Sequence, residues 1–172
     1  MTTETTNQES LSRALRTALR RLPGPVSLVT SYDPTDGTPA GIVASAVIPV
    51  SLEPPSMLVA VNRHASLHRI IVSSGRFCIN LLGVAQTAFV PLFSDGAMRT
   101  RRFESPEWQF AERVPWLPAA CANIFCRVDE TLVFGTHELV IGTVHDVKSD
   151  PERASDPLGW LEGNFAQLDR LR

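Results

Sequence analysis

The sequence predicts a single, mainly β domain that folds as a closed or nearly closed antiparallel barrel with a few short helices. Two observations predict this class. Short runs of β-prone residues recur along most of the chain and are separated by turn-forming segments. The chain has 172 residues, of which 44% are hydrophobic and 20% are charged, the balance of one globular domain. Residues 1–10 are expected to form a flexible tail and residues 11–172 the domain.

An amphipathic helix is expected first. Leucines and alanines recur at helical spacing from Leu11 to Leu22, and arginines occupy the opposite face. Proline and glycine at positions 23–25 end the helix. We expect this helix to pack on its own domain, although a basic amphipathic helix can also lie on a membrane surface.

Strand signals follow the helix. The β-prone runs are residues 26–32, 41–50, 56–61, 77–82 and 107–114, and the longest are 122–133 and 138–147. The last two are separated by residues 134–137, which predicts a hairpin or a meander. Short helices are expected from Leu67 to a stop at Gly75 and over residues 86–93. Residues 94–106 are polar and arginine-rich, which predicts a mobile loop.

Composition excludes several classes of function. The formal net charge is -2, without the basic excess of a nucleic-acid-binding domain. No apolar run reaches the ~18 residues that would span a membrane, and the first ten residues do not resemble a signal peptide. Three cysteines cannot form a closed disulfide framework, which favours the reducing cytoplasm. Lys148 is the only lysine, so covalent amine catalysis is not expected.

Most catalytic motifs are absent. The chain has no dinucleotide-binding G-x-G-x-x-G after a strand, no P-loop and no nucleophile elbow. His64 and His68 have the i, i+4 spacing of two metal ligands on one helix face. The other histidines, His137 and His145, lie on a distant β-run, so no metal site is expected.

Two segments have the chemistry of a cofactor site. Ser66 is placed to cap the helix that follows it, and with Asn62 and Arg63 it would make an anion site, or it would simply cap the helix. The small residues 44–46 would let a flat group approach the backbone, or would allow tight sheet packing. Arginines 99, 101 and 102 could grip phosphates or belong to a solvated loop.

Taken in order, seven blocks of the chain resemble the flavin reductase-like family of FMN-binding split-barrel proteins. Residues 22–30, L-P-G-P-V-S-L-V-T, are similar to the family's opening F-P-T-G-V-x-V-V-T. The other blocks are residues 41–55, 62–66, 77–82, 102–103, 135–137 and 157–165, and the resemblance spans roughly residues 11–168. Val43, Ala46, Val47 and Thr136 depart from the residues that are usual in these blocks.

The resemblance implies a fold, a site and an activity. The fold would be an antiparallel, Greek-key-type split β-barrel that forms a homodimer with the flavin near its interface. His137 would be the catalytic residue, orienting the nicotinamide for hydride transfer from its C4 to flavin N5. Residues 43–46 would face the flavin ring, residues 62, 63 and 66 would hold the ribityl chain and phosphate, and residues 102 and 103 would close over the flavin. The implied cofactor-binding residues are therefore Val43, Ala44, Ser45, Ala46, Asn62, Arg63, Ser66, Arg102 and Phe103.

The expected function is that of a cytoplasmic NAD(P)H-dependent flavin reductase. It would use FMN or FAD with NADH or NADPH, and it would supply reduced flavin by diffusion to a partner monooxygenase. Two alternatives stay open at this stage. One is a flavin carrier without turnover, and the other is a split-barrel interaction module without a cofactor.

Overall fold

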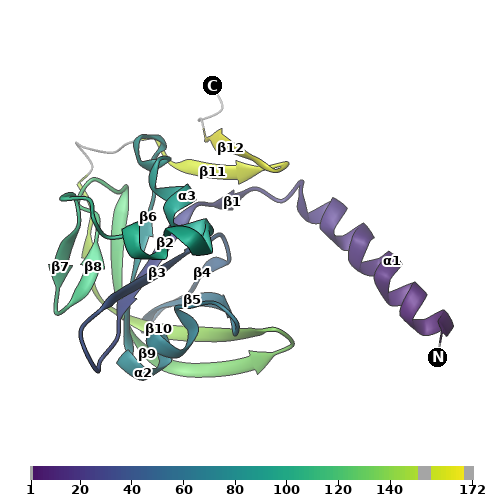
Figure 1. Ribbon diagram of the computed structural model, residues 1–172, viewed down its shortest axis with the longest axis horizontal. Coiled ribbons are helices and arrows are strands. Elements are labelled where there is room, and N and C mark those ends of the chain that lie inside the picture. Colours follow the sequence, from purple (N-terminus) through teal and green to yellow (C-terminus); the bar gives the residue numbers. More distant parts are fainter. Residues whose placement is uncertain (1, 151–155, 169–172) are drawn as a thin grey trace.

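The computed structural model describes residues 2–150 and 156–168 of the chain (Figure 1). Its main feature is a seven-stranded antiparallel sheet, made of β2 (Ser27–Tyr32), β3 (Pro39–Ala44), β4 (Val47–Leu52), β5 (Pro55–Asn62), β6 (Arg76–Leu81), β9 (Ala122–Phe134) and β10 (His137–Lys148). The strand order is β3-β2-β6-β9-β10-β5-β4. This mainly β, antiparallel architecture confirms the predicted fold class.

The two edge strands of this sheet are consecutive in the chain. β3 and β4 are joined by Ser45 and Ala46, although the sequence pattern predicts one continuous run over residues 41–50. The backbone N–H of Ala60 on β5 donates to the carbonyl of Ala46 at 3.1 Å, which extends the β4–β5 ladder to this joint. Because only two residues separate the two edge strands, the end of β3 and the start of β4 lie next to each other. The sheet therefore curls into a barrel that is split where β3 passes into β4.

Two small sheets accompany the barrel. β1 (Gly24–Pro25) pairs with β11 (Leu158–Leu161), which pairs with β12 (Asn164–Gln167). The run expected as one strand over 107–114 is instead a hairpin of β7 (Gln109–Ala111) and β8 (Val114–Trp116). Glu112 and Arg113 turn this hairpin with positive φ angles of 48° and 73°.

The first helix differs most from its prediction. α1 runs over Thr2–Leu19, so it begins before Leu11 and includes residues that were expected to form a tail. Figure 1 shows α1 projecting away from the barrel. Its leucines are exposed, with Leu11 at 68% and Leu15 at 54%. The expectation that this helix packs on its own domain is therefore wrong.

The other helices are short and lie against the barrel. α2 (His68–Ser74) ends at Gly75, which adopts the left-handed conformation with φ of 65°, as the sequence predicts. The helix expected over 86–93 is divided into the 3-10 helix η1 (Val84–Gln86) and α3 (Phe89–Ser94). Residues 96–101, expected in a mobile loop, form a second 3-10 helix, η2 (Gly96–Arg101).

Two apolar clusters hold these elements together. The barrel interior buries the side chains of Val29, Val59, Val61, Ile71, Phe77, Ile79 and Val140. A second cluster fixes α3 against the outside of the barrel, where Phe93 and Phe89 contact the Trp108 ring at centroid distances of 5.6 and 5.7 Å. Each fully buried side chain of this size contributes about 1.5–3 kcal/mol. The second cluster therefore places α3 and η2 firmly beside β3.

The far end of β10 carries the single lysine. Lys148 Nζ lies 4.3 Å from the centroid of the Trp116 ring and 5.7 Å from that of Phe125, which are cation–π distances. Cys78 and Cys126 are buried, and the three cysteines are free of disulfides. Within the described residues, no helix is long and apolar enough to cross a membrane.

Candidate active site

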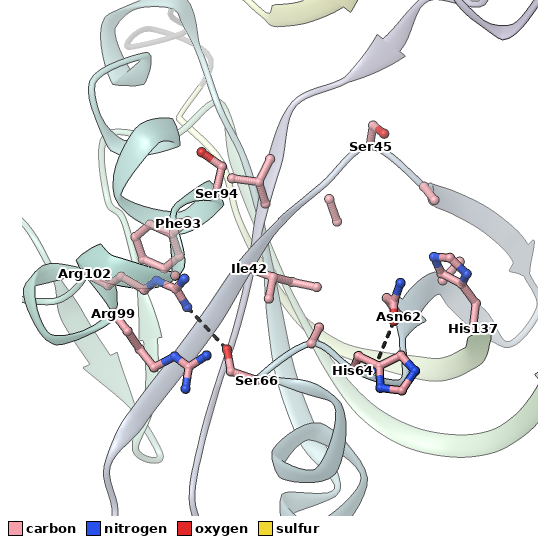
Figure 2. Close-up of a pocket in the computed structure, with 16 residues that line it drawn as sticks. Ile42, Ser45, Asn62, His64, Ser66, Phe93, Ser94, Arg99, Arg102 and His137 are labelled. Atoms are coloured by element: carbon pink, nitrogen blue, oxygen red, sulfur yellow. Dashed lines mark hydrogen bonds between the residues drawn. The ribbon is translucent and has the colours of Figure 1, made fainter. Parts of the chain in front are cut away.

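A cavity of about 530 Å³ opens beside the joint between β3 and β4. Cofactor and ligand pockets usually have volumes of 300–1,000 Å³, so this space suits a cofactor-sized molecule. Figure 2 shows side chains from β3, the loop after β5, the α3–η2 segment and the start of β10 around it. The lining residues are Ile42, Val43, Ala44, Ser45, Ala46, Ala60, Asn62, His64, Ala65, Ser66, Phe93, Ser94, Gly96, Arg99, Arg102 and His137.

The cavity brings together every predicted site residue except Arg63 and Phe103. Arg63 is exposed and lies near Glu138, whose pKa it helps to lower. Phe103 packs behind the cavity wall, with its ring centroid 5.2 Å from that of Phe93 and 4.9 Å from that of Trp108. The roles of all the predicted site residues remain predictions, but eight of them line one space.

One wall of the cavity is built from small residues. Ala44 ends β3, and Ser45 and Ala46 are exposed between β3 and β4. Because the strand ladder is broken there and the side chains are short, a flat molecule can come close to the backbone. The wall can therefore contact a planar ring through backbone groups and the Ser45 hydroxyl.

The loop after β5 is joined to the start of β10. Asn62 pairs with His137 across the two strands, and the Arg63 backbone N–H donates to the Thr136 carbonyl at 3.0 Å. The Asn62 side chain accepts a hydrogen bond from the His64 backbone N–H at 2.9 Å. The Thr136 hydroxyl lies 3.0 Å from His137 Nδ1. His137 is exposed at the rim of the cavity, and Thr136 can hold the orientation of its ring.

Ser66 lines the cavity but does not cap α2. The residue at the cap position is Leu67, and it makes no side-chain cap hydrogen bond. Instead, the Ser66 hydroxyl oxygen accepts a hydrogen bond from Arg102 Nη1 at 3.4 Å (Figure 2). The predicted cap was wrong because one extra residue of the loop adopts helical angles before the helix begins.

Arg102 is buried, with 5% of its surface exposed, although it was expected in a mobile loop. Its guanidinium donates to the carbonyls of Leu92, Gly41 and Asp95 at 2.9, 2.9 and 3.2 Å. Burial, together with the nearby positive charge of Arg99, lowers the pKa of Arg102. The side chain therefore fastens α3 and η2 to β3.

A partly buried ion pair joins α2 to β10. His68 Nε2 on α2 is 2.5 Å from the Glu138 Oε2 atom on β10, and the two side chains are 15% and 11% exposed. The hydrogen bond from His68, then that from Thr131, and the charge of Arg63 lower the pKa of Glu138. This pair ties α2 to the strand residue next to His137.

Several lining residues were not predicted. Phe93, Ser94 and Gly96 come from segments with no distinctive motif, and His64 lies in the matching block 62–66 but was given no role toward a cofactor. Arg99 lines the cavity from η2. The arginine cluster over 99–102 was a signal for this end of the cavity. The sequence could not show which of its members faces inward.

A second, more apolar cavity of about 390 Å³ adjoins the first. It shares Val43, Ser45 and Ser94 with the first cavity. The rings of Trp160 and Phe165, from β11 and β12, form its far wall and pack edge to face at a centroid distance of 5.3 Å. The small-residue wall is therefore accessible from a polar and an apolar side.

The fold is a split antiparallel barrel, and its cavity is cationic at one end and lined by small residues at the other. These features are those of a barrel protein that binds a cofactor. The family model described as "Flavin reductase like domain" matches residues 19–169. The chain belongs to this flavin reductase-like family.

Named relatives and a solved structure agree with this assignment. The chain is 35% identical to the reductase component of the FADH(2)-dependent resorcinol hydroxylase of Rhizobium sp. (strain MTP-10005), with 91% of this chain and 87% of the relative aligned. It is 37% identical to the FMN reductase (NADH) RutF of Agrobacterium fabrum, over 86% and 83%. Nitrilotriacetate monooxygenase component B from Mycobacterium thermoresistibile superimposes with a TM-score of 0.85 at 26% identity, covering 94% and 89% of the two chains.

Proposed function

We propose that the protein is an NAD(P)H-dependent flavin reductase that uses FMN or FAD. Bound flavin would supply the chemistry, by accepting at N5 a hydride from the nicotinamide C4. The observation that carries the proposal is the single cavity that gathers eight of the predicted residues. Membership of the flavin reductase-like family supports it.

The residues present fit a flavin. The positive end of the cavity, at Ser66 and the neighbouring arginines, suits a phosphate, and the wall of residues 44–46 suits a planar ring. Ser45 would offer its hydroxyl to the ring and Asn62 would bind the ribityl chain. The adjoining apolar cavity leaves room at the ring's hydrophobic edge.

His137 would orient the nicotinamide from the rim of the cavity. Hydride transfer between two cofactors needs proximity and orientation rather than a strong acid or base. The wall of residues 44–46 fits a reaction that needs no strong acid or base, because it is made of alanines and one serine and holds no such group. Thr136 would keep the His137 ring in place through the contact to Nδ1.

We also propose that the enzyme is a cytoplasmic homodimer that delivers reduced flavin by diffusion to a monooxygenase. Exposed apolar side chains support a dimer, since Leu52 and Phe134 are 85% and 79% exposed on β4 and β9, and α1 exposes its leucines. Three cysteines that form no disulfide suit a reducing compartment. Light scattering after size-exclusion chromatography tests the dimer, and a monomer at micromolar concentration would contradict it.

The test of function follows NADH and NADPH consumption at about 340 nm with added FMN or FAD. Wild-type protein should turn over many equivalents of nicotinamide per protein. His137→Ala should lose most of this turnover, whereas His145→Ala should not, because His145 lies on the same strand outside the cavity. Flavin binding without turnover would favour a carrier, and no binding would leave an interaction module.

A further inference from the structure

The positive end of the cavity contains two arginines in different states. Figure 2 shows the Arg99 and Arg102 side chains beside Ser66, at the end of the cavity opposite His137. Arg99 is exposed and lines the cavity, whereas Arg102 is buried. The two charges are close enough for Arg99 to lower the pKa of Arg102. An anion at this end would relieve that repulsion.

Arg102 has little capacity left for a ligand. A guanidinium has five N–H donors, and Arg102 uses four of them in hydrogen bonds to three carbonyls and the Ser66 hydroxyl. The Gly41 and Leu92 carbonyls hold it at 2.9 Å, so it cannot swing into the cavity without breaking these bonds. Arg102 is therefore a positioning residue, and it orients Ser66.

The hydrogen bond from Arg102 prepares Ser66 to act as a donor. Because the Ser66 oxygen accepts from a guanidinium, its own proton is free to point to an acceptor in the cavity. A hydroxyl aimed in this way suits a phosphate oxygen. The orientation of Ser66 thus adds a neutral donor beside the Arg99 charge.

The positive charge of Arg99 is not neutralised by an ion pair with any residue that the structure describes. The ion pairs found among residues 2–150 and 156–168 are His68–Glu138, Arg76–Glu112 and Arg101–Glu104, and none of them includes Arg99. The nearest acidic residue in sequence, Asp95, uses its carboxylate to cap η2 by accepting from the Ala97 N–H at 2.8 Å. The guanidinium of Arg99 is therefore available to an anionic ligand.

We propose that Arg99 recognises the phosphate on the flavin ribityl chain, so that the protein selects FMN and FAD over riboflavin. Resting on the proposed function, this assignment makes Arg99 a specificity residue, with Ser66 as the second donor. A phosphate could also come from the 2′-position of NADPH. The distance of Arg99 from His137, which would orient the nicotinamide, favours the flavin phosphate.

The test compares dissociation constants for FMN and riboflavin, measured by the change in flavin fluorescence. Wild-type protein should bind FMN about tenfold or more tightly than riboflavin, and Arg99→Gln should remove most of this difference while leaving riboflavin affinity unchanged. Arg99→Lys should restore part of it. Arg101→Gln is the matched control, since Arg101 is 61% exposed on the same 3-10 helix and pairs with Glu104.

Each outcome decides the proposal. Loss of FMN preference in Arg99→Gln alone supports it. Three results overturn it: a wild-type protein that binds both flavins equally, an unchanged preference in Arg99→Gln, or an equal loss in Arg101→Gln. A selective rise in the Michaelis constant for NADPH over NADH, with flavin affinity intact, overturns it in favour of the 2′-phosphate. Failure of the proposed function is distinct, because wild-type protein would then turn over no nicotinamide with any flavin.

Discussion

Replacing Arg102 by methionine should destabilise the protein, because it removes the buried guanidinium that links α3 and η2 to β3. Methionine keeps much of the packing on Phe93, whose ring centroid lies 5.5 Å from Arg102 Cζ, but it has no donor. The Gly41 carbonyl would lose a buried hydrogen bond, and those of Leu92 and Asp95 would lose part-buried ones that water can replace.

The size of the loss in unfolding free energy follows from the three carbonyls that lose a hydrogen bond. A buried carbonyl left without a partner costs about 1–3 kcal/mol, and each part-buried one costs about 0.5–1 kcal/mol. We therefore expect the free energy of unfolding to fall by about 2–5 kcal/mol. Arg102→Lys should recover part of this loss, because one ammonium group cannot reach all three carbonyls.

Urea unfolding at a fixed protein concentration provides the assay, because association would shift apparent stability. Tryptophan fluorescence is a suitable signal, since the Trp108 indole donates to the Arg102 carbonyl at 3.0 Å. Arg101→Met is the control, and its exposed pair with Glu104 should be worth less than about 1 kcal/mol. If Arg102→Met unfolds at the same urea concentration as wild type, with the same dependence of unfolding free energy on urea, the hydrogen bonds of Arg102 do not stabilise the fold.

Three further changes test other parts of the structure. Gly41→Ala should lower the free energy of unfolding, measured in urea, by about 1–3 kcal/mol, because the added Cβ would lie 2.7 Å from Phe93 Cε1. Gly96→Ala is the control and should leave stability unchanged, because no atom lies within 4 Å of its added Cβ. Equal stabilities of the two variants would show that the Phe93 ring can move aside. Glu138→Gln should lower stability at pH 7 by about 1–2 kcal/mol. Because folding lowers the pKa of Glu138 from its usual value of 4.5, its contribution is complete above pH 4.5 and is lost as the pH falls through the lowered pKa of the folded state, so the difference between the variant and wild type should shrink as the pH falls below 4.5; a difference that stays constant from pH 7 to 3 would argue against this. Ser66→Asp should weaken FMN binding by about tenfold or more, because the new carboxylate repels the phosphate, and it should leave riboflavin affinity unchanged. Titration of the variant with both flavins measures these affinities. Unchanged FMN affinity would refute the place assigned to the phosphate.

Local signals predicted much of the fold correctly. The helix after Leu67 ends at Gly75 because that residue adopts positive φ, which glycine permits without strain. The hairpin of the two longest strands turns at Gly135, with φ of 58°, for the same reason. Such features depend on a few neighbouring residues, and the sequence contains them directly.

Errors arose where distant contacts decide the structure. Residues 41–50 have continuous β propensity, and the break at Ser45 and Ala46 falls where the chain passes from one edge strand of the sheet to the other. The segment around Arg102 has the composition of a solvated loop, yet carbonyls from α3 and β3 surround its guanidinium. Helix α1 begins in a polar stretch without apolar periodicity, so its first half gave no helical signal.

The candidate site was predicted through the family resemblance more than through residue chemistry. The small residues 44–46 and the segment 62–66 each had a plain structural explanation, and their meeting in one cavity depends on the barrel. Arg63 and Phe103 lie in the matching blocks but outside the cavity lining, since neighbours in a strand or turn point in different directions. The inward direction of Arg99 depends on the turn of η2, which the sequence did not indicate.

The position of Lys148 has a practical consequence for attaching the protein to a surface. Strand β10 begins with His137 at the cavity and ends with Lys148, so the two lie up to about 36 Å apart at 3.3 Å per residue. Since no other side chain in the sequence carries a primary amine, a lysine-directed linker would couple at this one side-chain position. Molecules coupled through this side chain, rather than through the terminal amine, would share one attachment point at the end of β10 away from His137.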